Sequence, residues 1–190
     1  INLVFKKNII NEVERFIKKK FSKGKILGVH FRGSDQKIAA LHPFPPTLKQ
    51  MFELTDKIMK KKEYKYIFLV TEEEDYFQEF KKKYGKKLIT YDHFRSKNDI
   101  FKNSKRKNHR YLLGYETIIN MILLSRTQHL LHSNSNLSAM AVHISKKKIK
   151  QTIIFNGINS KNIFLSNILW YIKFYLPYKF GGFKNKVLNK

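Results

Sequence analysis

The sequence predicts an α/β fold, a Rossmann-like parallel sheet with helices on both faces. Short apolar runs rich in β-branched and aromatic residues alternate with longer segments of helical periodicity along the 190 residues. Short polar turns join them, as expected of βαβ units with parallel strands and right-handed crossovers. No internal repeat or low-complexity linker interrupts this order. A doubly wound sheet is therefore expected.

Residues Asn8–Lys20 carry apolar side chains three and four positions apart, which predicts an amphipathic helix. After the first strand, a Pro-rich turn at His42–Pro46 leads to Thr47, a preferred N-cap for a helix through about Lys60. Gly85 is expected to stop a short helix that follows the second strand. The five expected strands are Lys25–Phe31, Tyr64–Val70, Lys87–Tyr91, Gln128–His132 and Thr152–Asn156.

The second half of the chain continues the alternation. Residues Asp92–Asn108 are polar, basic and weakly periodic, which predicts a long loop. Residues Leu113–Ser125 form a strongly apolar helix, and the polar turn Ser133–Asn136 opens another helix that runs to about Ser145. These elements complete the predicted sheet and its covering helices.

The charge balance is strongly basic, with 39 Lys and Arg against 14 Asp and Glu and a formal net charge of +25. Such an excess suits nucleic acid or an anionic membrane surface. The excess is mostly Lys in short scattered runs, and we interpret it as solvated helix faces. A dedicated nucleic-acid surface stays an alternative.

The chain has no cysteine, which removes disulfides and thiolate chemistry and fits a reducing, cytoplasmic compartment. No apolar run approaches the roughly 20 residues that cross a bilayer, and no signal-peptide pattern begins the chain. The sequence begins at Ile1 instead of Met, and we expect it to be a fragment of a longer protein.

Three parts follow from these patterns. Residues 1–24 form an N-terminal helix, expected to be the remnant of a missing domain or to contact one, and residues 25–158 form the Rossmann-like domain. Residues 159–190 form an aromatic and basic helical segment, with its helix at Asn162–Phe183. One interpretation packs this helix on its own domain. The other places it on a membrane interface, at the inner face of the membrane.

Three strand ends carry polar side chains that we expect to meet in one crevice, because ligands of open α/β sheets bind at the carboxyl ends of the strands. The first lies in GVHFRGSDQK, residues Gly28–Lys37, where a buried strand delivers His30 and Arg32 to a turn that ends at Asp35. The planar fork of an Arg is suited to a phosphate or carboxylate. The alternative is an ordinary strand with Arg32 paired to Asp35.

The second strand end holds Thr71 and the acidic run Glu72–Asp75. Four adjacent acids at the start of a helix more often complement its dipole than bind a cation, and we expect no metal site. Glu72 or Glu73 is instead a candidate to accept hydrogen bonds from a base or a ribose.

The third strand end, His132–Asn136, offers hydroxyls, amides and the unpaired backbone N–H groups of a helix start, a place where anions bind. Opposite an Arg it would form a pyrophosphate clamp without metal. The alternative is simple capping, because Ser and Asn are the preferred caps.

Three sequence motifs that mark other classes of enzyme are absent. GxGxxG, GxxxxGK[ST] and HExxH are all missing, which argues against a dehydrogenase, a kinase and a zinc hydrolase. Five of the seven histidines show no metal spacing, namely His93, His109, His129, His132 and His143. We expect His30 to be a buried structural residue, and His42, beside Pro43 in a turn, to be the better candidate for lining a site.

Five motifs, in this order, resemble the fucosyltransferase superfamily of α1,6-fucosyltransferases, nodulation fucosyltransferases and protein O-fucosyltransferases. They span about Lys25 to His143 and read VHFRGSD, HPFPPT, IFLVTEEEDYFQEF, HRYLLGYE and INMILLSRTQHLLHSNSNLSAMA. The resemblance implies the donor-binding half of a GT-B enzyme, whose parallel sheet holds GDP-fucose. It also implies metal-independent, inverting transfer of fucose to an acceptor hydroxyl, without a cofactor.

The resemblance also implies roles for residues. Arg32 would contact the diphosphate and stabilise the leaving GDP as the catalytic residue. The implied donor-binding residues are His30, Gly33 and Asp35 in the first motif, His42 in the Pro-rich turn, Thr71 and Glu72 near the nucleoside, and Ser133, Ser135 and Asn136 at the helix that faces the phosphates.

Three positions depart from the family pattern. The α1,6-fucosyltransferases carry two adjacent Arg residues, whereas Gly33 follows Arg32 here, as in the protein O-fucosyltransferases. Residues 36–41, QKIAAL, contain no acid where those enzymes carry the Glu held to act as base, so no base is assigned. Asn120 stands where the family often has Asp.

We therefore expect a glycosyltransferase that uses a nucleotide-sugar, GDP-fucose first of all, and acts on a glycan such as a bacterial surface polysaccharide. As a donor half alone, the chain is expected to bind GDP while transferring little. Two alternatives stay open: a basic α/β module that binds nucleic acid or an anionic surface, and a nucleotide-binding domain without turnover. The basic module predicts lysines on one face and steep salt dependence of binding.

Overall fold

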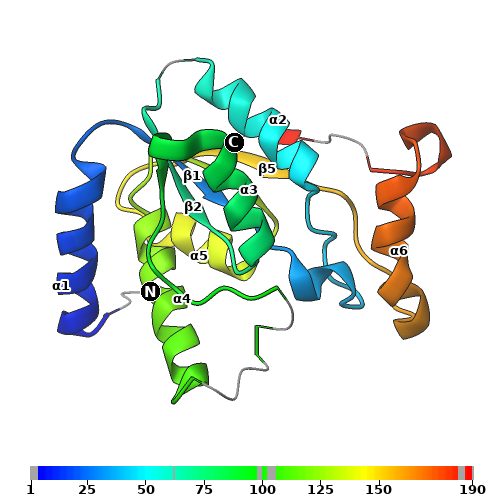
Figure 1. Ribbon diagram of the computed structural model, residues 1–190, viewed down its shortest axis with the longest axis horizontal. Coiled ribbons are helices and arrows are strands. Elements are labelled where there is room, and N and C mark those ends of the chain that lie inside the picture. Colours follow the sequence, from blue (N-terminus) through cyan, green and yellow to red (C-terminus); the bar gives the residue numbers. More distant parts are fainter. Residues whose placement is uncertain (1–3, 62, 98–99, 102–105, 184–186, 190) are drawn as a thin grey trace.

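The computed structural model describes residues 4–61, 63–97, 100–101, 106–183 and 187–189 (Figure 1). Its centre is a six-stranded sheet in the order β3-β2-β1-β4-β5-β6, in which the first five strands are parallel and β6 is antiparallel to β5. The strands are β1 (Ile26–His30), β2 (Tyr66–Val70), β3 (Leu88–Ile89), β4 (His129–Ser133), β5 (Lys150–Ile154) and β6 (Val187–Asn189). The predicted fold class is confirmed.

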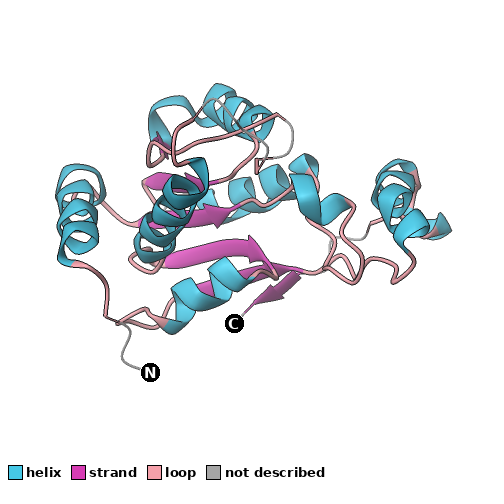
Figure 2. Cartoon of the chain, turned by 90° about the horizontal axis from the view of Figure 1, so that it is seen from below, coloured by secondary structure: helices cyan, strands magenta, loops and turns pink. Residues whose placement is uncertain are grey.

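Helices cover both faces of this sheet (Figure 2). They are α1 (Lys7–Phe16), α2 (Leu48–Met59), α3 (Glu74–Tyr84), α4 (His109–Leu124), α5 (Asn136–His143) and α6 (Ile163–Tyr175). Side chains alternate along β1, so Ile26 packs in the core under α1, α4 and α5, while Leu27 and Val29 pack in the core under α2 and α3. Strands buried on both faces are expected of such a three-layer arrangement.

Local capping signals act where the sequence places them. The Thr47 hydroxyl accepts a hydrogen bond from Gln50 N at 3.2 Å, and the Gln50 side chain accepts one from Thr47 N at 2.9 Å, which forms a capping box at the start of α2. Gly85 ends α3 with a φ of +49°, in the region that favours glycine. Both predictions are confirmed.

Several predicted boundaries are wrong. The first helix is α-helical only to Phe16 and ends in a π-helical turn at Ile17–Phe21. Strand β3 keeps two of five predicted residues, because the Thr90 hydroxyl and the Tyr91 carbonyl accept hydrogen bonds from a side chain, that of Arg95, where the predicted strand would continue. The fifth strand begins and ends two residues earlier than predicted, since Gly157 at φ +91° turns the chain away.

Helix α4 begins at His109, four residues before the predicted start at Leu113. Its first turn is polar, so the apolar pattern does not reveal it. Asn108 in the left-handed conformation, at φ +54°, precedes the helix, and His109 Nε2 lies 2.7 Å from the Ile100 carbonyl. Tertiary anchoring therefore extends the helix.

The predicted C-terminal helix, Asn162–Phe183, is too long. Helix α6 ends at Tyr175 because Pro177 has no N–H to continue it and forces Leu176 into an extended conformation. After a 3₁₀ turn at Tyr178–Phe180, the chain returns to the sheet as β6, a strand the sequence does not predict. No helix in the described part of the chain is long and apolar enough to cross a membrane.

Candidate functional site

The strand order reverses around β1, which lies between β2 and β4. His30 at the end of β1 is in register with Val70 of β2 and with His132 of β4, so the three predicted strand ends are neighbours. The chain leaves β1 for α2 on one face and leaves β4 for α5 on the other. Such a switch point is where open α/β sheets form their ligand crevice.

His30 connects β1 to the start of α5. Its ring is 2 % exposed, and Nδ1 lies 2.6 Å from Ser138 Oγ and 3.2 Å from Ser135 Oγ. Burial, followed by the positive charges of His132 and Arg32, lowers the pKa of His30 to about 3. The ring is neutral at pH 7, as expected of a structural histidine.

Helix α5 begins with Ser135 as N-cap, whose hydroxyl accepts a hydrogen bond from Ser138 N at 3.2 Å. Simple capping by Ser135 is thus observed. The next two backbone N–H groups, those of Asn136 and Leu137, have no carbonyl acceptor within a helix that starts here. Ser133 Oγ is buried without a hydrogen-bond partner among the described residues. This helix start therefore keeps donors that an anion can use.

Ser135→Ala is expected to lower the free energy of unfolding by about 1 kcal/mol, because it removes both the cap of α5 and a hydroxyl beside His30. Urea unfolding followed by circular dichroism measures this loss. Ser22→Ala is the control, since the Ser22 hydroxyl makes an exposed hydrogen bond and its loss should change little. Equal stability of both variants would contradict the role of Ser135.

Arg32 follows β1 and is held by Glu72 from the end of β2. Arg32 Nε lies 3.7 Å from Glu72 Oε1, and Gly33 N donates to the same oxygen at 3.2 Å. The Arg32 side chain keeps 31 % of its surface exposed. Glu72 thus orients the guanidinium and shapes the loop that carries it.

Glu73, Lys37 and Tyr76 form a second contact between the ends of β1 and β2. Lys37 Nζ lies 3.1 Å from Glu73 Oε1, 5.0 Å from the centre of the Tyr76 ring and 5.2 Å from that of Trp170. Burial lowers the pKa of Lys37, but Tyr76 and Glu73 outweigh it, so the pKa is raised. Tyr76 stacks on Phe31 with ring centres 3.9 Å apart. Sequence analysis did not single out Lys37 or Tyr76.

Thr71 is fully buried, and its hydroxyl accepts a hydrogen bond from Glu73 N at 3.3 Å. Its carbonyl lies 2.8 Å from His93 Nε2, while Arg95 donates to His93 Nδ1 at 3.3 Å. The Tyr91 carbonyl also lies 2.8 Å from His93 Nδ1, so a backbone carbonyl faces each ring nitrogen. Burial and the Arg95 charge lower the pKa of His93. Thr71 therefore supports the turn from within.

The described part of the predicted loop, residues 92–108, folds onto α4. Glu116 accepts a hydrogen bond from Phe94 N at 3.2 Å and forms an ion pair with Arg106. Ser96 also forms a bridge to Glu73 at the end of β2. Glu116 thus holds this loop against α4. Sequence analysis did not identify this role, although Glu116 is the last residue of the motif HRYLLGYE.

One predicted site residue, His42, lies apart from these contacts. His42 is exposed, and its carbonyl accepts a hydrogen bond from Asn159 N at 2.8 Å, which places it beside the segment after β5. The backbone of Asp35 lies in a 3₁₀ turn at Ser34–Lys37, and its side chain is outside the described part of the structure. Among the described residues, no group of three or more His, Asp or Glu side chains is arranged to hold a metal ion.

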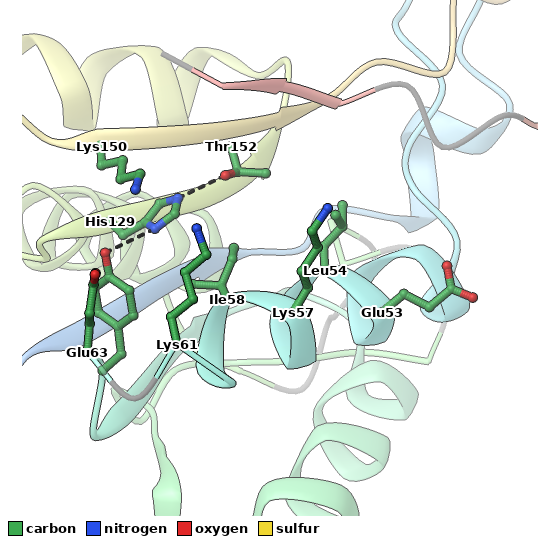
Figure 3. Close-up of a pocket in the computed structure, with 10 residues that line it drawn as sticks. Glu53, Leu54, Lys57, Ile58, Lys61, Glu63, His129, Lys150 and Thr152 are labelled. Carbon is green, nitrogen blue, oxygen red and sulfur yellow. Dashed lines mark hydrogen bonds between the residues drawn. The ribbon is translucent and has the colours of Figure 1, made fainter.

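A cavity of about 680 Å³ lies at the opposite edge of the sheet (Figure 3). It is lined by the amino ends of β4 and β5 and by α2. His129 in its wall has Tyr64 OH 3.2 Å from Nδ1 and Thr152 Oγ1 2.9 Å from Nε2, so both ring nitrogens have partners. Charged residues of both signs line the cavity: Lys57, Lys61, Lys150, Glu53 and Glu63. This cavity is therefore separate from the strand ends described above.

The sheet order and the strand ends define a Rossmann-like α/β domain whose strand order reverses at β1, between β2 and β4. No protein-family model and no curated protein sequence matches the chain. Solved structures of fucosyltransferases do match. NodZ from Bradyrhizobium superposes with a TM-score of 0.57 and 13% identity over 83% of this chain and 48% of that chain.

Two matching structures were obtained with GDP-fucose. NodZ α-1,6-fucosyltransferase soaked with GDP-fucose gives a TM-score of 0.53 and 19% identity, over 80% of this chain and 45% of that chain. POFUT1 in complex with GDP-fucose gives 0.53 and 13%, over 80% and 47%. The chain therefore has the fold of one half of these fucosyltransferases and spans less than half of their length.

Proposed function

We propose that this chain is the donor-binding half of a fucosyltransferase-like glycosyltransferase and that it binds GDP-fucose at the carboxyl edge of its sheet. One observation carries the proposal: Arg32 and the N-terminus of α5 stand at the ends of adjacent strands, β1 and β4, on the two sides of the switch point. A guanidinium and a helix start are both anion-binding groups. The GDP and GDP-fucose in the NodZ and POFUT1 structures support this assignment.

The proposed roles follow from this geometry. Arg32, oriented by Glu72, contacts the diphosphate and stabilises the charge that develops on the leaving GDP. The backbone N–H groups at Asn136 and Leu137 bind the other phosphate oxygens. In the proposed reaction fucose passes with inversion, and without a metal, to a hydroxyl of a glycan such as a bacterial surface polysaccharide.

None of the residues to which the proposal assigns a role is a catalytic base. Residues 36–41 contain no acid, and Glu72 and Glu73 are paired with Arg32 and Lys37. A domain that binds the donor without turnover is therefore the second candidate. Fucose transfer to glycan acceptors, followed by mass spectrometry, separates the two, because only the transferase forms a fucosylated product.

Arg32→Ala is expected to weaken the binding of GDP and GDP-fucose by about 2 kcal/mol or more, roughly 30-fold, because charge-assisted hydrogen bonds are lost. Isothermal titration without added metal measures the dissociation constants. Arg15→Ala is the matched control, since Arg15 is exposed on α1, the helix that precedes the amino end of β1. The proposal fails if neither nucleotide binds, or if both variants bind as tightly as the unaltered chain.

A further inference from the structure

Helix α6 (Ile163–Tyr175) and the turn that follows it present an apolar surface that the rest of the domain does not cover. Phe164 is 84 % exposed and Tyr175 is 80 % exposed. Only two side chains of the helix are buried, those of Ser166 and Trp170. The exposed surface, here called the α6 surface, consists of Ile163, Phe164, Leu165, Ile168, Tyr171, Ile172, Phe174, Tyr175, Leu176, Tyr178 and Phe180. Exposed apolar patches of this extent mark interaction sites.

Although its apolar side chains are exposed, helix α6 is anchored to the rest of the domain. Trp170 Nε1 donates to the Pro45 carbonyl at 3.1 Å, and the Ser166 carbonyl accepts a hydrogen bond from Asn159 at 3.0 Å. Asn162 caps the helix through hydrogen bonds from two backbone N–H groups. One line of side chains therefore fixes α6, at one end of the longest axis of the molecule (Figure 1), and the remaining faces point outward.

Basic side chains predominate around this surface. After Glu116 the sequence contains no Asp or Glu, whereas residues 117–190 contain 11 Lys and Arg. Lys161, Lys173 and Lys179 lie within or beside the α6 surface. Glu53 of α2 is the acid that shares a pocket with Lys173 and Tyr178, and the excess of Lys over acids complements a negatively charged partner.

We propose that the α6 surface docks the protein on an anionic membrane, with α6 lying in the plane of the lipid headgroups. Apart from Asn167, the exposed positions of the helix are apolar, and the apolar side chains continue through the turn to Phe180, which suits a continuous apolar phase better than a single protein groove. Aromatic side chains with flanking Lys are typical of helices at the membrane interface. Each Lys near anionic lipid strengthens such binding.

The test is co-sedimentation of the chain with vesicles of phosphatidylcholine alone and with 30 mol% phosphatidylglycerol, at low and high salt. We expect binding to the anionic vesicles, weaker binding to the neutral ones, and loss on raising the salt concentration. The double variant Phe164→Ser/Tyr175→Ser should bind anionic vesicles at least tenfold more weakly. Tyr111→Ser is the control, because Tyr111 is equally an exposed aromatic residue but lies on α4.

Three results would overturn the proposal. The first is no binding to anionic vesicles at low salt. The second is binding that the double variant retains in full, which would assign attachment to scattered lysines. The third is a dimer in light scattering that the double variant abolishes while vesicles bind neither form, which would assign the α6 surface to a second copy. Both substituted side chains are exposed, so the circular dichroism spectrum should stay unchanged and confirm that the variant folds.

Discussion

Lowering the pH from 6.5 to 4.5 is expected to reduce the free energy of unfolding by about 4 kcal/mol through two buried histidines, His30 and His129. Burial is the largest cause of the lowered pKa of both rings. The charges of His132 and Arg32 add to it at His30, and those of Lys150 and Lys61 at His129. The pKa of His30 is lowered to about 3 and that of His129 to about 4.

The sign follows from the protons bound in each state. In the unfolded chain these rings accept a proton near pH 6.5, whereas in the folded chain they stay neutral down to pH 3 or 4. The unfolded state therefore binds more protons in this interval, and each ring costs about 1.4 kcal/mol of stability per pH unit. The contribution is complete above pH 6.5 and is lost as the pH falls.

Urea unfolding at half-unit pH steps from 7.5 to 4.5 measures this dependence. His129→Gln, which removes one of the two rings at the edge remote from the candidate site, should reduce the slope markedly below pH 6.5. His143→Gln is the control for the substitution itself, because His143 is exposed on α5. A slope that His129→Gln does not alter would contradict the assignment.

Local patterns predicted the parts of the fold that depend on neighbouring residues. The buried strands appear as apolar runs, and Thr47 and Ser135 cap helices because their hydroxyls reach backbone N–H groups three residues along. The convergence of Arg32 and the α5 start also follows from topology alone, since parallel strands place their carboxyl ends at one edge.

The contacts that sequence analysis did not predict join distant segments. Strand β6 has three residues and exists because it pairs with β5, so no local pattern reveals it. Lys37 meets Glu73 36 positions away, and Trp170 approaches the same Lys37 only because α6 packs on the Pro45 carbonyl. Such partners become visible only when the sheet brings the strand ends together.

Gly33→Ala is expected to lower the free energy of unfolding by about 2 to 3 kcal/mol, because overpacking displaces neighbouring side chains. A Cβ at this position would overlap Glu73 Oε1 and lie 2.6 Å from Tyr76 Cε2. Neither neighbour yields freely, since Glu73 is paired with Lys37 and Tyr76 is stacked on Phe31. Glycine is thus required by the close approach of α3 to the loop after β1.

Gly114→Ala is the matched control for this substitution. Gly114 is an exposed glycine inside α4, and a Cβ there meets nothing within 4 Å. Because Ala has the higher helix propensity, Gly114→Ala should raise the free energy of unfolding by up to about 1 kcal/mol. The same chemical change is therefore expected to act in opposite directions at the two positions, which urea unfolding of both variants determines.

A double-mutant cycle with Glu73→Ala tests the cause of the loss at Gly33. If the added methyl group destabilises by pushing Glu73 away from Lys37, removing the Glu73 carboxylate removes much of that clash. Gly33→Ala/Glu73→Ala should then lose at least about 1 kcal/mol less than the sum of the single variants. Additive losses would show that Tyr76 or the backbone, and not Glu73, opposes a side chain here.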